Sequence, residues 1–366
     1  MRASIVDPSA FTRPYDHALC TALAHAGAEV ELVTSRFAYG DVPAPDGYAV
    51  RELFYARAAG VPGSRRRRGT KLASHVPDML RYRRLAAGAD VVHFQWLTIP
   101  WLDGRLLPDR PLVLTAHDLL PREPRPGQAR AQRRLYDRLD ALIVHSEYGR
   151  HQLVQRLRVP ADKVHVIRHG AFTHVAQRAL ASLPPALASA TAPIVLFFGL
   201  LRPYKGIGTM LAAWRGIDDA ELWIVGREMM DMTPLRASAP PGVRFLNRFV
   251  AEAEVGAYFA RADVVVLPYA RTERFDMSGV LATALAFGKP VVMSDIGGFS
   301  EAAATGAGRL VAPDDPAQLH DALAELVGDA ATRARLGDAA LAAARGPYSW
   351  DVAARQTLAL YESIRR

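Results

Sequence analysis

Residues 193–211 have the sequence PIVLFFGLLRPYKGIGTML, which divides into three parts of different character. Ile194 to Phe198 is apolar without the alternation of a half-exposed strand, as expected of a parallel strand buried on both faces. Arg202 and Lys205 lie in the short loop that follows, and helical spacing begins at Gly208. Two cations beside the free N–H groups at the start of a helix predict a diphosphate site.

The same order of strand and helix continues toward the C-terminus. Short apolar runs rich in Val, Ile and Leu predict strands at residues 221–226, 242–246, 262–269, 290–295 and 308–313. Helical spacing appears between these runs, and residues 350–366 predict a long final helix. Regular alternation of strands with helices is typical of an α/β domain built on a parallel sheet.

The first half of the chain repeats this pattern. Its predicted strands are residues 3–6, 30–34, 90–94, 111–115, 141–145 and 163–167. Residues 171–193 interrupt the alternation, because they are rich in Ala, Ser and Pro. A chain of 366 residues suffices for two domains. We therefore expect two doubly wound domains, with ligands bound at the carboxyl ends of the strands in the cleft between them.

The composition favours a cytoplasmic globular protein. Half of the residues are hydrophobic, which argues against global disorder. The single cysteine excludes a disulfide framework and a cysteine-based zinc site. The N-terminus lacks the apolar run of a signal peptide. The longest uncharged run, residues 179–201, contains three prolines and is not expected to span a membrane.

Positive charge is concentrated between Arg51 and Arg84. This segment holds ten basic and two acidic residues, with four arginines in a row at 65–68. Residues 71–85 have helical spacing, with one side formed by Leu72, Val76, Met79 and Leu80. The segment is either a solvated face or a contact for an anionic partner, such as a membrane surface or an anionic acceptor. Nucleic acid is not expected, because the run lacks interleaved aromatic residues and no nucleic-acid-binding motif is present.

A second candidate phosphate site lies in the sequence DMSGVLATALAFGKPVVMSDIGGFSE, residues 276–301. Ser278 and Gly279 open a helix directly after a strand and loop, where small residues let backbone amides approach a phosphate. No GxGxxG motif follows the first strand, which argues against a nicotinamide-binding first domain. Walker A, HExxH and Asp-x-Asp sequences are also absent.

Taken together, these blocks resemble the retaining, nucleotide-sugar-dependent glycosyltransferases of family four, which have the GT-B fold of two Rossmann-like domains. The segments FFGLLRPYKG, ADVVVLPY and SGVLATALAFGKPVVMSDIGGFSE carry most of the resemblance, and VVHFQW, LTAHDLL and KVHVIRHGAF extend it through the first half. The resemblance implies an acceptor domain over residues 1–180, onto which the helix at 350–366 packs back, and a nucleotide-sugar donor domain over residues 190–349.

The resemblance also implies roles for individual residues. Arg202 and Lys205 match the cationic pair that holds the donor diphosphate, and His117 matches the histidine beside the transferred sugar. Main-chain atoms below the phosphates would come from Ser278, Gly279 and Val280. Main-chain atoms at the nucleobase would come from Arg248, Phe249 and Val250.

Two positions depart from the family pattern. A Glu-x7-Glu pair would stand at positions 275 and 283, where this chain has Phe275 and Thr283. Glu273 or Asp276 is near enough to replace the first carboxylate. Only the hydroxyl of Thr283 can replace the second, which binds the ribose in the family, so a dTDP-sugar donor is a further hypothesis. In the first loop, the family's Gly-Gly gives way to Pro14, Tyr15 and Asp16.

The expected reaction transfers a sugar from a nucleotide-diphosphate donor to a glycan, lipid-linked or small-molecule acceptor, with retention of the anomeric configuration. Arg202, Lys205 and helix amides would neutralise the leaving diphosphate, so no metal or other cofactor is expected. Two alternatives stay open: another GT-B reaction class, such as an epimerase or phosphorylase, and a non-catalytic sugar-nucleotide-binding protein. We expect a cytoplasmic protein with peripheral contact at the inner face of the membrane through residues 51–84.

Overall fold

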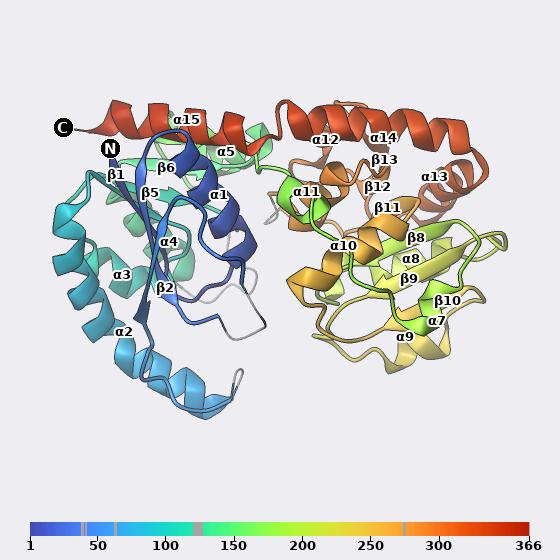
Figure 1. The fold of residues 1–366 in the computed structure, drawn as a ribbon, viewed down its shortest axis with the longest axis horizontal. Coiled ribbons are helices and arrows are strands. Elements are labelled where there is room, and N and C mark those ends of the chain that lie inside the picture. The colour runs from blue at the N-terminus through green and yellow to red at the C-terminus, as the bar shows by residue number, and fades with distance from the viewer. Residues whose placement is uncertain (38–39, 41, 62–63, 120–126, 274–275, 366) are drawn as a thin grey trace. The chain divides into compact units, whose positions relative to one another are not determined.

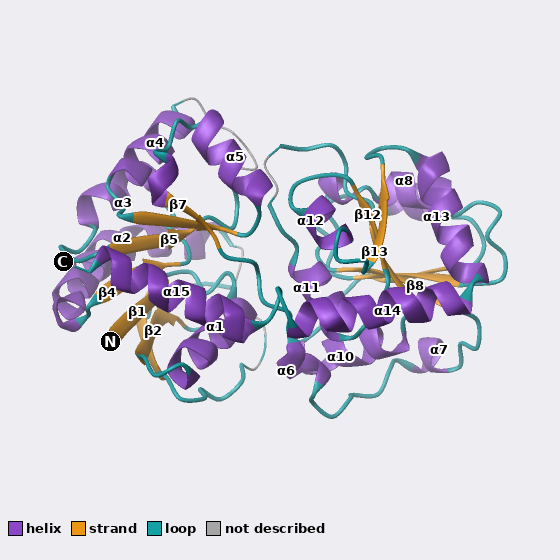
Figure 2. Cartoon of the chain, turned by 90° about the horizontal axis from the view of Figure 1, so that it is seen from above, coloured by secondary structure: helices purple, strands orange, loops and turns teal. Residues whose placement is uncertain are grey.

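The computed structural model describes residues 1–366 apart from 38–39, 41, 62–63, 120–126, 274–275 and 366. The chain forms two compact units, residues 1–168 with 350–366 and residues 169–349. Each unit is a parallel sheet with helices on its faces (Figures 1 and 2), which confirms the predicted α/β, GT-B class of two Rossmann-like domains. Residues 171–193, which interrupt the alternation of strands and helices in the sequence, belong to the second unit.

The first unit contains a seven-stranded sheet in the order β3-β2-β1-β4-β5-β6-β7. The order runs outward from β1 in both directions, as in a doubly wound sheet, so the topological switch point lies between β1 and β4. Its strands are β1 (Arg2–Asp7), β2 (Glu29–Ser35), β3 (Ala49–Phe54), β4 (Val91–Phe94), β5 (Leu112–Thr115), β6 (Ala141–Val144) and β7 (Val164–Val166). Strand β3 escaped prediction because it is an edge strand whose sequence AVRELF is largely exposed.

Helices cover both faces of this sheet. They are α1 (Arg13–His25), α2 (Arg65–Leu85), α3 (Pro100–Leu106), α4 (Gln128–Asp137), α5 (Glu147–Gln155) and α15 (Trp350–Ile364). The last of them comes from the far end of the chain and packs along α1 (Figure 1). The core between sheet and helices is apolar and aromatic, with Val6, Phe94 and Val144 among its fully buried members.

Helix α2 corrects the prediction for the basic segment in two respects. It begins at Arg65 rather than Lys71, because Ser64 caps it by accepting a hydrogen bond from the Arg67 amide (3.2 Å). The four consecutive arginines therefore form its first turn. The face that packs on the sheet is formed by His75, Met79 and Tyr82. Of the predicted apolar side, Met79 is buried and Val76 half-buried, whereas Leu72 and Leu80 are 61% and 42% exposed.

The second unit has a six-stranded sheet in the order β10-β9-β8-β11-β12-β13. Its strands, all predicted, are β8 (Ile194–Phe198), β9 (Glu221–Val225), β10 (Val243–Leu246), β11 (Val264–Leu267), β12 (Val291–Ser294) and β13 (Gly308–Val311). Its helices are α6 (Thr173–Ala176), α7 (Pro185–Ala188), α8 (Ile207–Ala213), α9 (Thr233–Ala237), α10 (Glu252–Arg261), α11 (Gly279–Ala286), α12 (Phe299–Ala303), α13 (Pro316–Gly328) and α14 (Ala330–Arg345). Among the described residues of the whole chain, no helix is both long and apolar enough to cross a bilayer.

Candidate active site

The loop after β8 is shaped around Lys205. Gly199 follows the strand with φ +107°, and a Cβ there would lie 3.0 Å from Lys205 Nζ. Gly206 has φ +70° and is pressed against the carbonyl group of Pro268, so no side chain fits at this position. These two glycines let the chain form the 3₁₀ turn η3 (Pro203–Lys205) and enter α8 with Lys205 folded inward.

Lys205 is buried, and Arg202 is half-buried with its Nε inside the protein. Only 5% of Lys205 is exposed, and its Nζ lies 4.9 Å from the centre of the Tyr269 ring and 3.5 Å from the Phe198 carbonyl oxygen. The Nε of Arg202 is buried and makes no hydrogen bond within the described part of the chain. A buried donor without a partner costs roughly 1–3 kcal/mol. The loop is therefore arranged for a ligand that accepts hydrogen bonds.

The N-terminus of α11 adjoins this loop. Ser278 caps the helix, since its Oγ accepts a hydrogen bond from the Val280 amide (3.2 Å). The same Oγ lies 3.1 Å from the hydroxyl of Tyr269, the tyrosine beside Lys205. A Cβ on Gly199 would lie 3.4 Å from Val280 Cγ2. The structure thus brings together the two candidate phosphate sites of the sequence, and the positive end of the α11 dipole adds to the cations.

The residues around the expected carboxylate pair lie on or near α11. Thr283 is buried and its hydroxyl donates to the Gly279 carbonyl (2.8 Å), so it has only lone pairs left to offer a ribose. Asp276 is fully buried, and its backbone carbonyl accepts a hydrogen bond from the Gly298 amide. Glu273 is exposed, and Phe275 lies outside the described residues.

The predicted nucleobase loop follows β10. The guanidinium of Arg248 donates to both carboxylate oxygens of Glu254 (2.9 and 2.6 Å) and to the hydroxyl of Tyr258 (3.0 Å). This pairing lowers the pKa of Glu254. Phe249 is 42% exposed and Val250 is buried. The side chain of Arg248 is thus engaged by α10, which leaves its main chain as the part that would meet a nucleobase.

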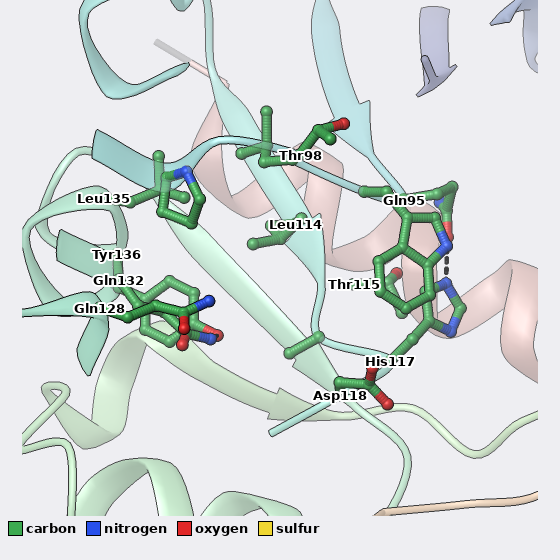
Figure 3. A pocket seen from close by; sticks show the side chains of 14 residues that line it. Gln95, Thr98, Leu114, Thr115, His117, Asp118, Gln128, Gln132, Leu135 and Tyr136 are labelled. Atoms are coloured by element: carbon green, nitrogen blue, oxygen red, sulfur yellow. Dashed lines mark hydrogen bonds between the residues drawn. The ribbon is translucent and has the colours of Figure 1, made fainter. Parts of the chain in front are cut away.

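In the first unit, His117 stands just beyond β5. Its ring stacks on Trp96 (5.2 Å between centroids, 20° between planes) and meets the edge of Tyr15 (4.7 Å, 89°). Its Nε2 lies 3.0 Å from Oε1 of Gln95 (Figure 3). Tyr15 comes from the first turn of α1, where Pro14 and Asp16 also lie. The chain thus has a buried aromatic at the position where the family has a flexible loop.

A cavity of about 160 Å³ opens beside His117 at the carboxyl ends of β4 and β5 (Figure 3). The side chains that line it are mainly amides, hydroxyls and aromatic rings. The polar ones are Gln95, Thr98, Thr115, His117, Asp118, Gln128, Gln132 and Tyr136. Sequence reasoning missed Gln95, although a signal existed. His93 and Gln95 stand two apart at the end of an apolar strand, so they point to the same face of the sheet.

Within the described residues, no three His, Cys, Asp or Glu side chains are grouped closely enough to hold a metal ion. The acidic side chains of the second-unit site, Glu273 and Asp276, are respectively exposed and buried. Within the described residues of this unit, the positive groups near the loop after β8 are Arg202, Lys205 and the α11 amides.

Residues 15–174 match the family model for glycosyltransferase family 4, and residues 192–329 match that for glycosyl transferases group 1. The D-inositol 3-phosphate glycosyltransferase of Corynebacterium efficiens is 30% identical over 93% of this chain and 87% of its own length. The chain belongs to glycosyltransferase family 4. As a family 4 member it is a glycosyltransferase that uses a nucleotide-sugar donor, which favours transfer over the epimerase and phosphorylase alternatives.

Other family 4 relatives and solved structures agree with this assignment. The phosphatidyl-myo-inositol mannosyltransferase of Mycobacterium leprae is 37% identical over 46% of each chain. The sucrose-phosphate synthase of Thermosynechococcus elongatus superposes with a TM-score of 0.78 at 20% identity, over 100% of this chain and 99% of that one. HepE of Anabaena, solved with UDP-glucose, superposes with a TM-score of 0.75 at 19% identity, over 99% and 100% of the chains. These two structures share the GT-B fold.

Proposed function

We propose that the protein is a retaining glycosyltransferase that moves a sugar from a nucleotide diphosphate to a polyhydroxylated acceptor, without a divalent metal. The observation that carries the proposal is the meeting of Arg202, Lys205 and the α11 N-terminus at one edge of the second sheet. The bond between the anomeric carbon and the diphosphate oxygen breaks, and charge develops on that oxygen. Two cations and a helix dipole neutralise this charge, which is the work a metal does in other transferases.

In the proposed step the acceptor hydroxyl attacks the anomeric carbon from the face that the diphosphate leaves. The new carbon–oxygen bond forms on the same side, so the configuration is retained, and the hydroxyl proton passes to the departing phosphate oxygen. This route requires no carboxylate nucleophile of the kind used by retaining glycosidases. His117 lies beside the transferred sugar and orients its hydroxyls.

The cavity beside His117 is the proposed acceptor site. Its volume of about 160 Å³ is close to the roughly 150 Å³ that accommodates a benzene ring in an apolar protein cavity. Its amide and hydroxyl side chains suit a ring that carries hydroxyls instead. The relatives named above have inositol 3-phosphate or phosphatidyl-myo-inositol in their names, which supports a cyclitol or its phosphorylated derivative.

The donor and the acceptor are tested separately. Thermal unfolding is followed with UDP, GDP, dTDP and ADP, since a bound nucleotide raises the melting temperature with the logarithm of its concentration over its Kd. Turnover is then measured with the stabilising nucleotide's sugars and inositol, inositol phosphate or phosphatidylinositol as acceptor. No stabilisation by any nucleotide would remove the donor assignment, and donor binding without transfer would favour the non-catalytic alternative.

The basic helix α2 supports a second part of the proposal, contact with an anionic membrane surface. Arg65, Arg66 and Arg68 are exposed in its first turn, next to Leu72, and none of the three arginines forms an ion pair within the described residues. Exposed cations beside an exposed apolar residue suit an anionic bilayer surface, at about 1 kcal/mol per basic residue.

Vesicle co-sedimentation tests this contact. We expect binding to anionic but not neutral vesicles, weakened by salt and by changing residues 65–68 to Ser. The matched control changes four exposed arginines elsewhere in the first unit to Ser. These are Arg105, Arg130, Arg134 and Arg138. Equal loss of binding in both variants would mean that net charge, and not α2, is responsible.

A further inference from the structure

A chain of buried hydrogen bonds leads from the C-terminal helix to His117. The hydroxyl of Tyr361 on α15 lies 2.6 Å from Nδ1 of His93 on β4. The other ring nitrogen, Nε2, lies 2.7 Å from the hydroxyl of Thr115 and 3.3 Å from the amide nitrogen of Gln95. The amide oxygen of Gln95 completes the chain at Nε2 of His117. Tyr361 and Gln95 are both fully buried, and His93 and Thr115 are 1% exposed.

The donors and acceptors in this chain follow from the charge of His93. Burial lowers the pKa of His93 to about 3, so its ring is neutral, with one N–H and one lone pair. The amide nitrogen of Gln95 can only donate, and so Nε2 of His93 accepts and Nδ1–H donates to Tyr361. The amide oxygen of Gln95 can only accept. Nε2 of His117 therefore carries a proton, which leaves Nδ1 as the acceptor nitrogen whenever the ring is neutral.

We propose that Gln95 is a positioning residue for His117, and that Tyr361 acts through His93 to fix which nitrogen of His117 carries the proton. The inference rests on the proposed place of His117 beside the transferred sugar. A sugar hydroxyl that meets Nδ1 would then donate to it, whereas the other tautomer would present an N–H to the same hydroxyl. The tautomer of His117 thus decides whether the sugar hydroxyl must donate or accept the hydrogen bond at Nδ1.

The ring of His117 is also held by a second path from α15. Trp350, the first residue of that helix, packs against Tyr15 (4.9 Å between centroids, 75°), and Tyr15 packs against His117. Trp96 covers the face of the imidazole. Two aromatic contacts therefore fix the plane of the ring and the Gln95 amide fixes its rotation.

The polar residues in this series of hydrogen bonds argue for a role in orienting His117 in addition to packing. A buried amide and imidazole cost desolvation that Leu or Val in the same strand would not. Polar chains of this kind are tolerable only when their members are satisfied, and here the ring of His93 and the amide of Gln95 each have a partner on both sides. The titratable neighbour His145, 5.4 Å from His117, has its pKa lowered to about 4 by burial and is also neutral, while Asp118 lines the adjacent cavity.

The tautomer of His117 can be measured without any substrate. Histidine labelled with ¹⁵N gives long-range proton–nitrogen correlations that distinguish Nδ1–H from Nε2–H, and the His117→Asn variant assigns the signals. We expect Nε2–H in the wild type. In Gln95→Met, which keeps the volume but removes both hydrogen bonds, we expect a mixed tautomer and a kcat about tenfold lower, with the donor KM changed less than threefold.

Gln95→Glu separates positioning from packing. The carboxylate still accepts from His117 but can no longer donate to His93. Its charge also favours the imidazolium form, so we expect the pKa of His117 to rise above the wild-type value and the acid limb of the pH–rate profile to move upward. If His117 had no part in turnover, its pKa would rise but the acid limb of the pH–rate profile would not move.

The far end of the chain has a matched control. Tyr361→Phe and Tyr82→Phe each remove one buried hydroxyl, and the hydroxyl of Tyr82 lies 2.9 Å from the Ser4 hydroxyl, outside the chain to His117. We expect only Tyr361→Phe to shift the nitrogen signals of His93 and His117. Equal shifts in both variants, or an unchanged tautomer in Gln95→Met, would overturn the inference. A tautomer shift with unaltered turnover would leave the relay standing and remove His117 from the proposed mechanism.

Discussion

The two units of this glycosyltransferase hold their functional groups by different means. In the second unit, Arg202 and Lys205 lie three residues apart in one loop, and the turn is shaped by Gly199 and Gly206. In the first unit, His117 contacts Tyr15 of α1 and Gln95 after β4, and the hydrogen bond that links Tyr361 of α15 to His93 joins residues 268 positions apart. The cationic loop of the second unit is therefore built from one short segment. The surroundings of the His117 ring in the first unit need segments from across that unit.

Lys205→Ala should produce the largest effect, because it removes charge from the local site. A charge-assisted hydrogen bond is worth about 1.5–3 kcal/mol, so kcat/KM should fall by roughly ten- to a hundredfold, with Arg202→Ala similar. Steady-state kinetics with the preferred donor gives the value. Lys289→Ala is the control, since this lysine of the same unit bonds the Ala260 carbonyl and lies outside the loop. Equal losses in Lys205→Ala and Lys289→Ala would contradict the assignment.

The first unit buries a pair of neighbouring acidic side chains. Asp7 at the end of β1 and Asp16 in the first turn of α1 are both fully buried, and Asp7 accepts hydrogen bonds from the amides of Ser9 and Thr12. Burial raises the pKa of Asp7, and burial together with the neighbouring Asp7 raises the pKa of Asp16 well above 3.8. The pair thus favours the protonated form in the folded state.

Asp16→Asn should therefore stabilise the protein at neutral pH. Because the pKa of Asp16 is raised in the folded protein, this carboxyl does not destabilise the folded state below about pH 3.8. The folded state loses stability as the pH rises through the raised pKa. A gain in the free energy of unfolding is therefore expected at pH 7, and it should disappear toward pH 4. Urea unfolding at several pH values measures it, with exposed Asp219→Asn as the control. A gain independent of pH would point to packing instead.

The Thr283 substitution sharpens the comparison within the donor site. Its hydroxyl already donates to Gly279, so it can contribute little to a ribose, and we expect UDP and dUDP to bind within about fivefold of each other. Isothermal titration measures both. In Thr283→Glu, which restores the family carboxylate, the preference for the ribonucleotide should increase. A wild-type preference above a hundredfold would show that another group reads the ribose.

Chelation should have the smallest effect. The cationic loop and the α11 dipole are expected to supply the positive charge for the diphosphate, so turnover in excess EDTA should stay within twofold of the untreated value. The assay uses purified protein with and without added magnesium or manganese. Activity lost to EDTA and restored by either ion would show that the cations are insufficient.

The sequence predicted the features that depend on residues close together in the chain. The strands of the second sheet, the cations of the loop after β8 and the start of α11 all follow from neighbouring residues, because parallel strands and helix caps have short-range patterns. Strand β3 was missed because an exposed edge strand lacks the apolar pattern of a central one. The contact between Tyr361 and His93 was beyond prediction, since it depends on where the last helix docks.

The return of the chain at Trp350 has a consequence for synthesis. Residues 169–349 form a continuous unit that can fold as soon as its last strand and helices have left the ribosome. The first unit is translated earlier, yet it lacks α15, and with it the buried rings of Trp350 and Tyr361, until the final residues emerge. The unit that is made first is thus completed last, and a chain cut short at residue 349 would contain a complete second unit and an incomplete first unit.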